Sequence, residues 1–488
     1  MRDVSLKRKE LYVLLVLGLF LVVFLQFALG VGGLAVVSSV ALVSLLVLLF
    51  LLAGSVRWRL LSYSFFVWLL LEGAFRKWFF PGLSSYIFFV KHMILIGPYL
   101  YILSSGIRIP KRYYPFLGLL LLYVTWGVLE AFNFRVTTDF RVQALGLITH
   151  FWFIPLIFLV PAVFDTEERI IGFFRKMVYL SLPILILGII QYFSPPFSPI
   201  NQYAPNDAAG QVGIALVGVH ARITGVFSYM TPYKAYLGVL TSVIIYLLVI
   251  RRIGGLGVLI LCLGVINMIM IGSRGGVASL LINSMLFVFF YLSLRGKLRV
   301  KKKVFIKYGL VVVFLLVSVI SFTNIGREAA LSLIERTKSA SSDVIPRIVF
   351  IYSPLRFLSD AGLVGYGIGT AYQGARAFVE DWGDMPREFE AEWERVLLEF
   401  GLIGFVIVVL LRVSILLYTW KVFKRIKTFE LKLLALMVFI HQLPVLYGLN
   451  IVFDYMNSII YWSLLGLLIS VSRLERNNAT KGPGIPTG

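Results

Sequence analysis

Hydrophobic residues in this chain run in long, nearly uninterrupted stretches that short polar segments separate. The longest stretch covers residues 254–294 and holds one charge, Arg274. Since a membrane-spanning α-helix takes about 20 residues, this stretch predicts two spans. They are joined at segment 272–276, where glycine allows a tight turn. A charge at a membrane turn is costly to place, so Arg274 is a functional candidate.

The same pattern along the chain predicts about fourteen transmembrane helices, each near the length that a bilayer requires. The predicted spans are 11–28, 33–54, 59–74, 84–104, 114–132, 142–163, 170–192, 230–250, 254–272, 276–294, 305–323, 396–418, 429–447 and 455–472. The alternation typical of an outer-membrane β-barrel is absent from the sequence. We therefore expect an all-α polytopic membrane protein with a single transmembrane domain, residues 1–475, and a disordered tail, 476–488.

The composition agrees with a membrane protein, and the charge and cysteine content argue against nucleic-acid binding and a disulfide framework. Hydrophobic residues make up 59% of the chain, charged residues only 14%, and the mean hydropathy is +0.90. The net charge of +22 comes from basic residues in short loops between spans, which indicates positive-inside bias rather than nucleic-acid binding. The single cysteine, Cys262, excludes an intramolecular disulfide framework.

Lysine and arginine recur in every second loop, which sets the predicted orientation. Both termini are expected in the cytoplasm. Two long loops then lie outside, 194–229 and 323–394, and the second one is expected to carry short helices and active-site residues.

Basic residues gather at the predicted external positions. Arg222 and Lys234 flank the start of one span, Arg274 occupies the turn, and Arg347 opens a helix in the large loop. Arginine suits a shared anion because its fork of donors matches phosphate oxygens. The alternative is that each arginine separately anchors a span end at lipid headgroups.

The segment from Glu388 to Gly401 supplies the candidate proton acceptor. In a helix, Glu392, Arg395 and Glu399 lie on one face. Either Glu392 or Glu390 is predicted to accept a proton beside the arginines, with Arg395 as a further cation. The alternative is a solvated acidic helix end. The external loops carry no metal-ligand signature, and no cofactor is predicted.

The order of these short motifs resembles the O-antigen ligase and Wzy-type O-antigen or exopolysaccharide polymerase superfamily, over roughly residues 75–470. The segments that carry the resemblance are Arg222-Ile223-Thr224-Gly225, Ser273-Arg274-Gly275, Pro346-Arg347 with Gly365-Tyr366-Gly367, Glu399-Phe400-Gly401-Leu402-Ile403-Gly404, and Arg76-Lys77-Trp78 with Pro81.

The resemblance implies a GT-C-like glycosyltransferase of the bacterial inner membrane that takes a glycan from undecaprenyl diphosphate at the external face. It implies that Arg222, Arg274 and Arg347 stabilise the diphosphate leaving group without a metal ion. The expected partners are lipid-linked donor and acceptor glycans, membrane lipids and a chain-length regulator. Ligases carry a histidine about eleven residues before the glycine equivalent to Gly401, where this chain has Glu390, so a polymerase is favoured. An O-antigen ligase or O-oligosaccharyltransferase, and a lipid-linked glycan transporter, are the alternatives.

Overall fold

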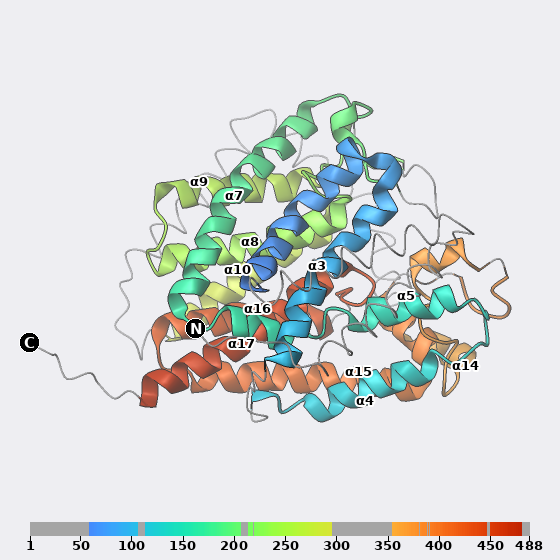
Figure 1. Cartoon of the computed structure of the whole chain (residues 1–488). Coiled ribbons are helices and arrows are strands. Elements are labelled where there is room, and N and C mark those ends of the chain that lie inside the picture. The colour runs from blue at the N-terminus through green and yellow to red at the C-terminus, as the bar shows by residue number, and fades with distance from the viewer. Residues whose placement is uncertain are drawn as a thin grey trace, which may run out of the picture.

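The computed structural model describes residues 58–105, 113–205, 213–217, 219–294, 354–379, 381–387, 389, 391–446 and 449–480. These residues are mostly helical (Figure 1). Seven helical segments are long and apolar enough to cross a membrane: Pro81–Ser104, Phe140–Val163, Glu167–Phe193, Met230–Val249, Glu392–Arg425, Phe429–Leu446 and Tyr455–Ala479. Within the described ranges the strands are β1 (Leu216–Val217) and β2 (His220–Ala221), which pair antiparallel. The chain is thus a helical, membrane-embedded protein.

Each predicted span within the described residues coincides with helix. The elements are a helix over 58–74, α3 (Ser84–Ser104), α4 (Leu117–Glu130), α5 (Phe140–Phe151), α6 (Leu156–Val163), α7 (Glu167–Phe193), α8 (Met230–Val249), α9 (Gly255–Met270), α10 (Arg274–Leu294), α15 (Glu392–Arg425), α16 (Phe429–Leu446) and α17 (Tyr455–Thr480). The predicted spans 11–28, 33–54 and 305–323 lie outside the described residues.

Besides shifts of the helix ends, the structure differs from the prediction in three places. The span 142–163 is divided between α5 and α6, with Pro155, which lacks a backbone N–H, in the break. The span 396–418 is interrupted at Gly401. Helix α17 continues past residue 476 to Thr480, so the first residues of the predicted tail are helical.

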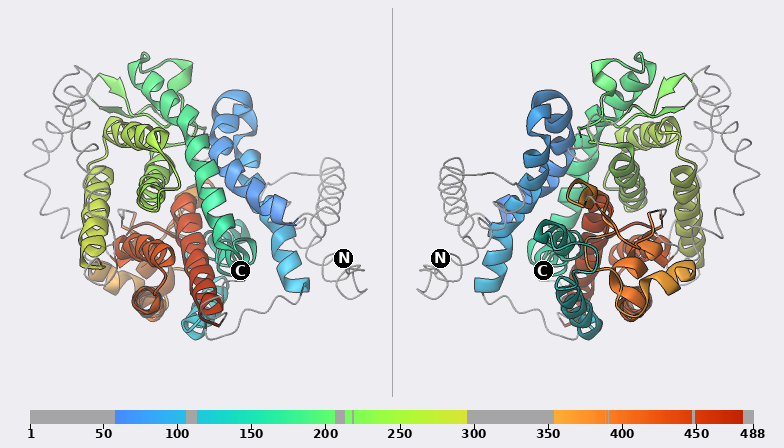
Figure 2. Two further views of the ribbon diagram at one scale, coloured as in Figure 1. Left: turned by 90° about the vertical axis from the view of Figure 1, so that its left-hand side faces the viewer. Right: turned by 90° about the vertical axis from the view of Figure 1, so that its right-hand side faces the viewer.

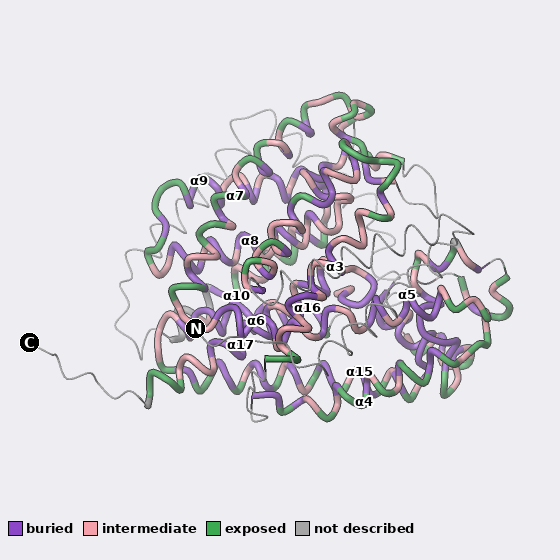
Figure 3. Tube along the Cα trace, viewed as in Figure 1, coloured by how far each residue is buried: buried purple, intermediate pink, exposed green. Residues whose placement is uncertain are grey.

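Helices α16 and α17 form the centre of the bundle. In α17, 78% of an 18-residue apolar segment is buried, against 33% of the corresponding segment in α7. Helix α17 packs against α6, α8 and α16, and α15 packs along α4 (Figures 1 and 2). In Figure 3, buried positions are frequent along α16 and α17, in the middle of the molecule. The start of α17 is therefore held from several sides.

A kink at Gly401 shapes α15. Gly401 has φ 62°, a left-handed conformation within an otherwise helical segment. In a straight helix Glu392 and Arg412 would lie about 30 Å apart, yet their side chains form an ion pair. The helix therefore folds back at the glycine, in keeping with the usual causes of sharp kinks.

The glycine-rich part of the large loop docks into this kink. The N–H groups of Tyr366 and Gly367 donate to the carbonyls of Leu398 (2.8 Å) and Glu399 (3.1 Å). In return, the N–H of Leu402 donates to the carbonyl of Gly362 (3.0 Å). The broken helical ladder is thus completed by a loop from the preceding short helices η5 (Pro354–Phe357) and α14 (Leu358–Ala361).

The Glu399 side chain also binds the same loop. Its Oε1 accepts the N–H of Ala371 (2.8 Å), and its Oε2 lies 2.7 Å from Nε2 of His150, whose Nδ1 is 2.7 Å from the Tyr123 hydroxyl. The His150 and Glu399 side chains are fully buried. Glu399 is therefore a positioning residue that ties α5 and α15 to the segment following Gly369.

We expect Gly401→Ala to destabilise the protein by roughly 2–5 kcal/mol. A left-handed non-glycine residue costs about 1–2 kcal/mol, and overpacking costs about 1–3 kcal/mol, because the new Cβ would overlap the backbone of Leu363. Thermal unfolding in detergent measures the change. Gly172→Ala, in α7 with open space around it, is the matched control. Equal stability of the two variants would show that the kink carries no such constraint.

Candidate functional site

The turn before α10 is joined to the segment before α8. The Nε of Arg222 donates to the carbonyl of Ile271 (2.9 Å), directly before the turn at Gly272. Ser273 caps α10, since its Oγ accepts the N–H of Gly276 (3.2 Å). Arg274 is the first residue of α10, and its side chain lies outside what the structure describes. The Arg222 side chain thus contacts the backbone just before the turn that leads to Arg274.

Lys234 passes over the same turn. A Cβ built at Gly276 would lie 3.0 Å from the side-chain carbons of Lys234, so glycine leaves room for the lysine stem. Lys234 interacts electrostatically with Arg222 and with Asp454, which precedes α17. The N-terminus of α10 adds the positive end of its dipole to these charges.

Tyr372, in the large loop, lies near further charged side chains of this region. Its hydroxyl bonds with that of Tyr455, the first residue of α17, which in turn lies 3.0 Å from the Thr149 hydroxyl. Three charged side chains act on Tyr372 electrostatically: Arg76, Arg395 and Asp454. Arg395 also donates to the carbonyl of Ala371 (3.2 Å). Arg395, from the first turn of α15, therefore lies beside the docked loop and near the start of α17.

Arg76 and Lys91 share one carboxylate, that of Glu72. Lys91 Nζ is 3.0 Å from Glu72 Oε1, and Arg76 is 3.3 Å from the same oxygen. Lys91 also lies over the Tyr455 ring, 5.4 Å from its centroid. We call the set Arg76, Lys91, Arg222, Lys234 and Arg395, with Asp454, the basic cluster. Its cations outnumber its carboxylates even with Glu72 included, and all but Lys91 are partly exposed.

Lys77 fixes the Arg222 segment. Its buried Nζ donates to the Thr224 hydroxyl (2.9 Å) and the Gly225 carbonyl (2.7 Å), and burial lowers the Lys77 pKa well below its usual range. Gln191 accepts the N–H of Gly225 (2.7 Å) and donates to its carbonyl (3.0 Å). Hydrogen bonds from Lys77 thus hold the Arg76-Lys77 segment against the Thr224-Gly225 segment, which lies far from it in the sequence.

Glu392 has a different environment from the one predicted. Its Oε1 pairs with Arg412, and its Oε2 accepts the N–H groups of Ile451 and of Val452 (2.8 Å). The Glu392 side chain is fully buried, and Arg412 stacks over Trp393 (4.2 Å). Both oxygens are engaged, so these contacts support a structural role in holding the segment that ends at Asp454.

We expect Glu392→Gln to lower the free energy of unfolding by about 3–5 kcal/mol, because it leaves the buried Arg412 guanidinium uncompensated. Glutamine keeps the acceptor for Ile451 and Val452, so the change isolates the charge. Asp165→Asn, whose partly exposed carboxylate pairs with Arg59 and Arg169 near the start of α7, should change stability by no more than about 1 kcal/mol. Chemical denaturation of both variants measures the difference, and a loss no larger than that of the control contradicts this role.

Asp454 is the carboxylate that the structure places among the cations. Its Oδ1 accepts the N–H of Asn457 (3.1 Å) at the start of α17. Burial raises the Asp454 pKa, while its bond to Asn457 and the charge of Lys234 act in the opposite direction. A partly exposed carboxylate with a raised pKa, beside several cations, suits proton transfer.

The structure thus brings Arg222, Lys234, Arg395 and the backbone of Arg274 to one region. Arg347 and Glu390 lie outside the described residues. Asp454, Tyr372 and Lys91 were not predicted from the sequence as site residues, and Arg76 entered only through the resemblance. An aspartate directly before an apolar span is a signal for an N-cap and an intramembrane charge, but it does not indicate which cations face it.

Among the described residues, no three His, Cys, Asp or Glu side chains gather closely enough to hold a metal ion. No protein-family model matches the chain, and no curated protein matches it.

Proposed function

We propose that the chain is a glycosyltransferase that joins glycan repeat units carried on undecaprenyl diphosphate into a polysaccharide. One observation carries the proposal: cations from several helices and the N-terminus of α10 lie near the carboxylate of Asp454, and these cations outnumber the carboxylates beside them, Asp454 and Glu72. Such a site suits an anion of high charge density on a membrane-bound substrate. The motif resemblance supplies the identity of the anion as a diphosphate and of its carrier as undecaprenol.

In this proposal the cations stabilise the leaving group. The acceptor hydroxyl oxygen attacks the sugar carbon bonded to the diphosphate, and that carbon–oxygen bond breaks with its electron pair leaving on the diphosphate. Arg222, Arg274, Lys234 and Arg395 offset the charge that develops there. Arg347 belongs to the same set through the resemblance. No metal ion is required by this scheme.

The hydroxyl proton passes to Asp454 in our proposal. Of the carboxylates predicted from the sequence, Glu392 is engaged by Arg412 and two backbone N–H groups, and Glu390 stays a prediction. Asp454 accepts the backbone N–H groups of Met456 and Asn457 and interacts electrostatically with Lys234 and Tyr372. Unlike Glu392, it forms no ion pair with an arginine among the described residues. It is the described carboxylate best placed to receive a proton at the basic cluster.

The finer architecture is also proposed. We infer about fourteen spans, from the span length that a bilayer requires, with a GT-C-like arrangement and both termini in the cytoplasm of a bacterial inner membrane. The basic cluster then faces outward. The loop-charge pattern and the helices found at the predicted spans support this arrangement.

Reconstitution of the full chain in vesicles with purified lipid-linked repeat unit tests the function. A polymerase produces a ladder of longer glycans from this substrate alone. A ligase or O-oligosaccharyltransferase transfers glycan only after a separate acceptor is added, and a transporter moves the substrate across the membrane without forming a bond. Either of these last results, or no reaction with fresh substrate and folded protein, overturns the polymerase proposal.

A further inference from the structure

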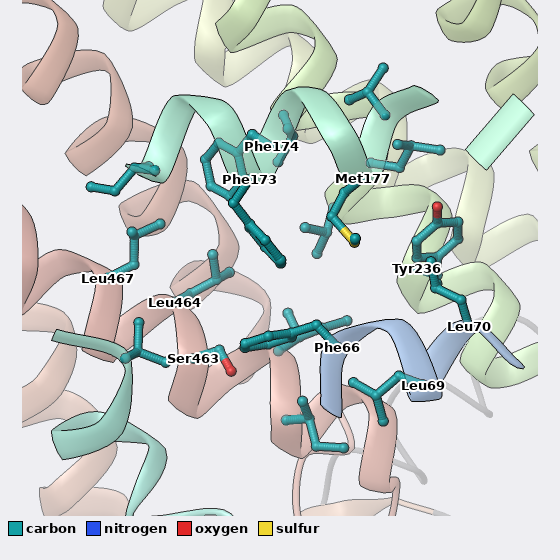
Figure 4. Close-up of a pocket in the computed structure, with 18 of the residues that line it drawn as sticks. Phe66, Leu69, Leu70, Phe173, Phe174, Met177, Tyr236, Ser463, Leu464 and Leu467 are labelled. Atoms are coloured by element: carbon teal, nitrogen blue, oxygen red, sulfur yellow. The ribbon is translucent and has the colours of Figure 1, made fainter. Parts of the chain in front are cut away.

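An apolar pocket opens between α7, α8, α17 and the helix over 58–74. Aromatic and aliphatic side chains of these helices point into a common space in Figure 4. The cavity volume is about 150 Å³. Its walls include Phe66, Phe173, Met177, Leu240, Val243 and Leu464. An apolar cavity of this size stays free of water and accepts hydrocarbon groups.

The pocket begins where the basic cluster ends. Lys234 belongs to the cluster, and Tyr236, two residues further along α8, lines the pocket. Asp454 belongs to the cluster, and Met456 lines the pocket at the start of α17. The starts of both helices therefore carry the charged residues, and the apolar lining begins at nearly the same level along the helix axes.

The pocket also reaches far along the helices. Its lining on α17 extends from Met456 to Leu467, which is about 16 Å at the rise of an α-helix. This is roughly half the hydrocarbon thickness of a bilayer. A ligand with an anionic head and an extended hydrocarbon chain fits this combination of a charged region and an elongated apolar pocket.

We propose that this pocket holds the hydrocarbon chain of the lipid-linked diphosphate, in the part next to its headgroup. This inference rests on the proposed function and adds the site that recognises the carrier. Charge attracts the head to Arg222 and Lys234, and burial of the chain against Phe173, Leu240 and Leu464 adds affinity. Each buried methylene strengthens binding by roughly fourfold.

Binding of two soluble probes separates the head from the chain. Isothermal titration in detergent compares farnesyl diphosphate with inorganic diphosphate on the full-length protein. We expect the wild type to bind farnesyl diphosphate at least about tenfold more tightly, because each buried methylene adds roughly fourfold. Binding of both probes with equal affinity overturns the chain pocket and leaves the proposed function standing. Binding of neither probe removes the anion site on which both proposals rest.

A pocket-filling variant supplies the structural test. Val243→Phe directs a larger ring into the cavity and should remove the preference for farnesyl diphosphate without changing the affinity for inorganic diphosphate. Leu464→Phe fills the cavity from α17 and serves where Val243→Phe fails to fold. Ile186→Phe, at a position of α7 that is 46% exposed, is the matched control and should retain the preference.

Two outcomes overturn the assignment. The first is an undiminished preference for farnesyl diphosphate in a folded, pocket-filled variant. The second is that phosphatidylglycerol competes with farnesyl diphosphate in the wild type and loses this effect in Val243→Phe, which shows that an ordinary phospholipid chain occupies the pocket.

Discussion

Polymer formation should fall by about 10²–10³-fold when Arg274 is replaced by alanine, the loss typical of removing one donor aimed at charge in the transition state. Arg274 opens α10, next to the Ile271 carbonyl that Arg222 contacts and the glycine that Lys234 crosses. Its charge adds to that of the helix N-terminus at this point. Removal leaves the remaining cations with less capacity to stabilise the departing diphosphate.

The measurement is the rate of glycan extension by reconstituted protein, together with thermal unfolding of the same preparation. Arg274→Lys keeps the charge without the bidentate fork, so we expect an intermediate rate. Arg252→Ala, at an exposed position just beyond the opposite end of α8, is the matched control and should retain activity. Unchanged extension by a folded Arg274→Ala protein contradicts the diphosphate role of this arginine.

Much of the fold follows from local sequence, because long apolar runs specify helices by length alone. This is why the predicted bounds of the span 84–104 coincide with α3. Interruptions are harder to predict. Gly401 lies within an apolar run, and its left-handed conformation depends on the loop from Gly362 to Gly369 that docks into the kink. The helix break and the loop therefore have to be known together.

The candidate site divides in the same way. The convergence of Arg222 with the turn before Arg274 could be predicted, since both adjoin span ends on one predicted side. The partner of Glu392 could not, because Arg412 is twenty residues further along α15 and reaches it only through the kink. Asp454 was likewise not assigned, since Lys234, the cation that acts on it, comes from α8, and Tyr372, with which it also interacts, comes from the docked large loop. Tertiary contacts decide which carboxylate faces the cluster.

Asp454→Asn should lower the rate of glycan extension by about 10²–10⁴-fold, the usual contribution of a positioned proton acceptor. Asparagine is as good an N-cap as aspartate, so the contact with the N–H of Asn457 and the start of α17 are expected to persist. The variant thereby separates proton transfer from folding. Thermal unfolding close to the wild-type value, with the rate lost, is the expected result.

The pH dependence gives a second, independent signature. Asp454 accepts a proton only when it is ionised, so the wild-type rate should fall as the pH drops through the Asp454 pKa. Burial raises this pKa, so the fall should begin above the usual aspartate value of about 3.9. The residual rate of Asp454→Asn should lack this limb. If the variant keeps both the rate and the acidic limb, the proton acceptor is a different group, and Glu390 becomes the next residue to replace.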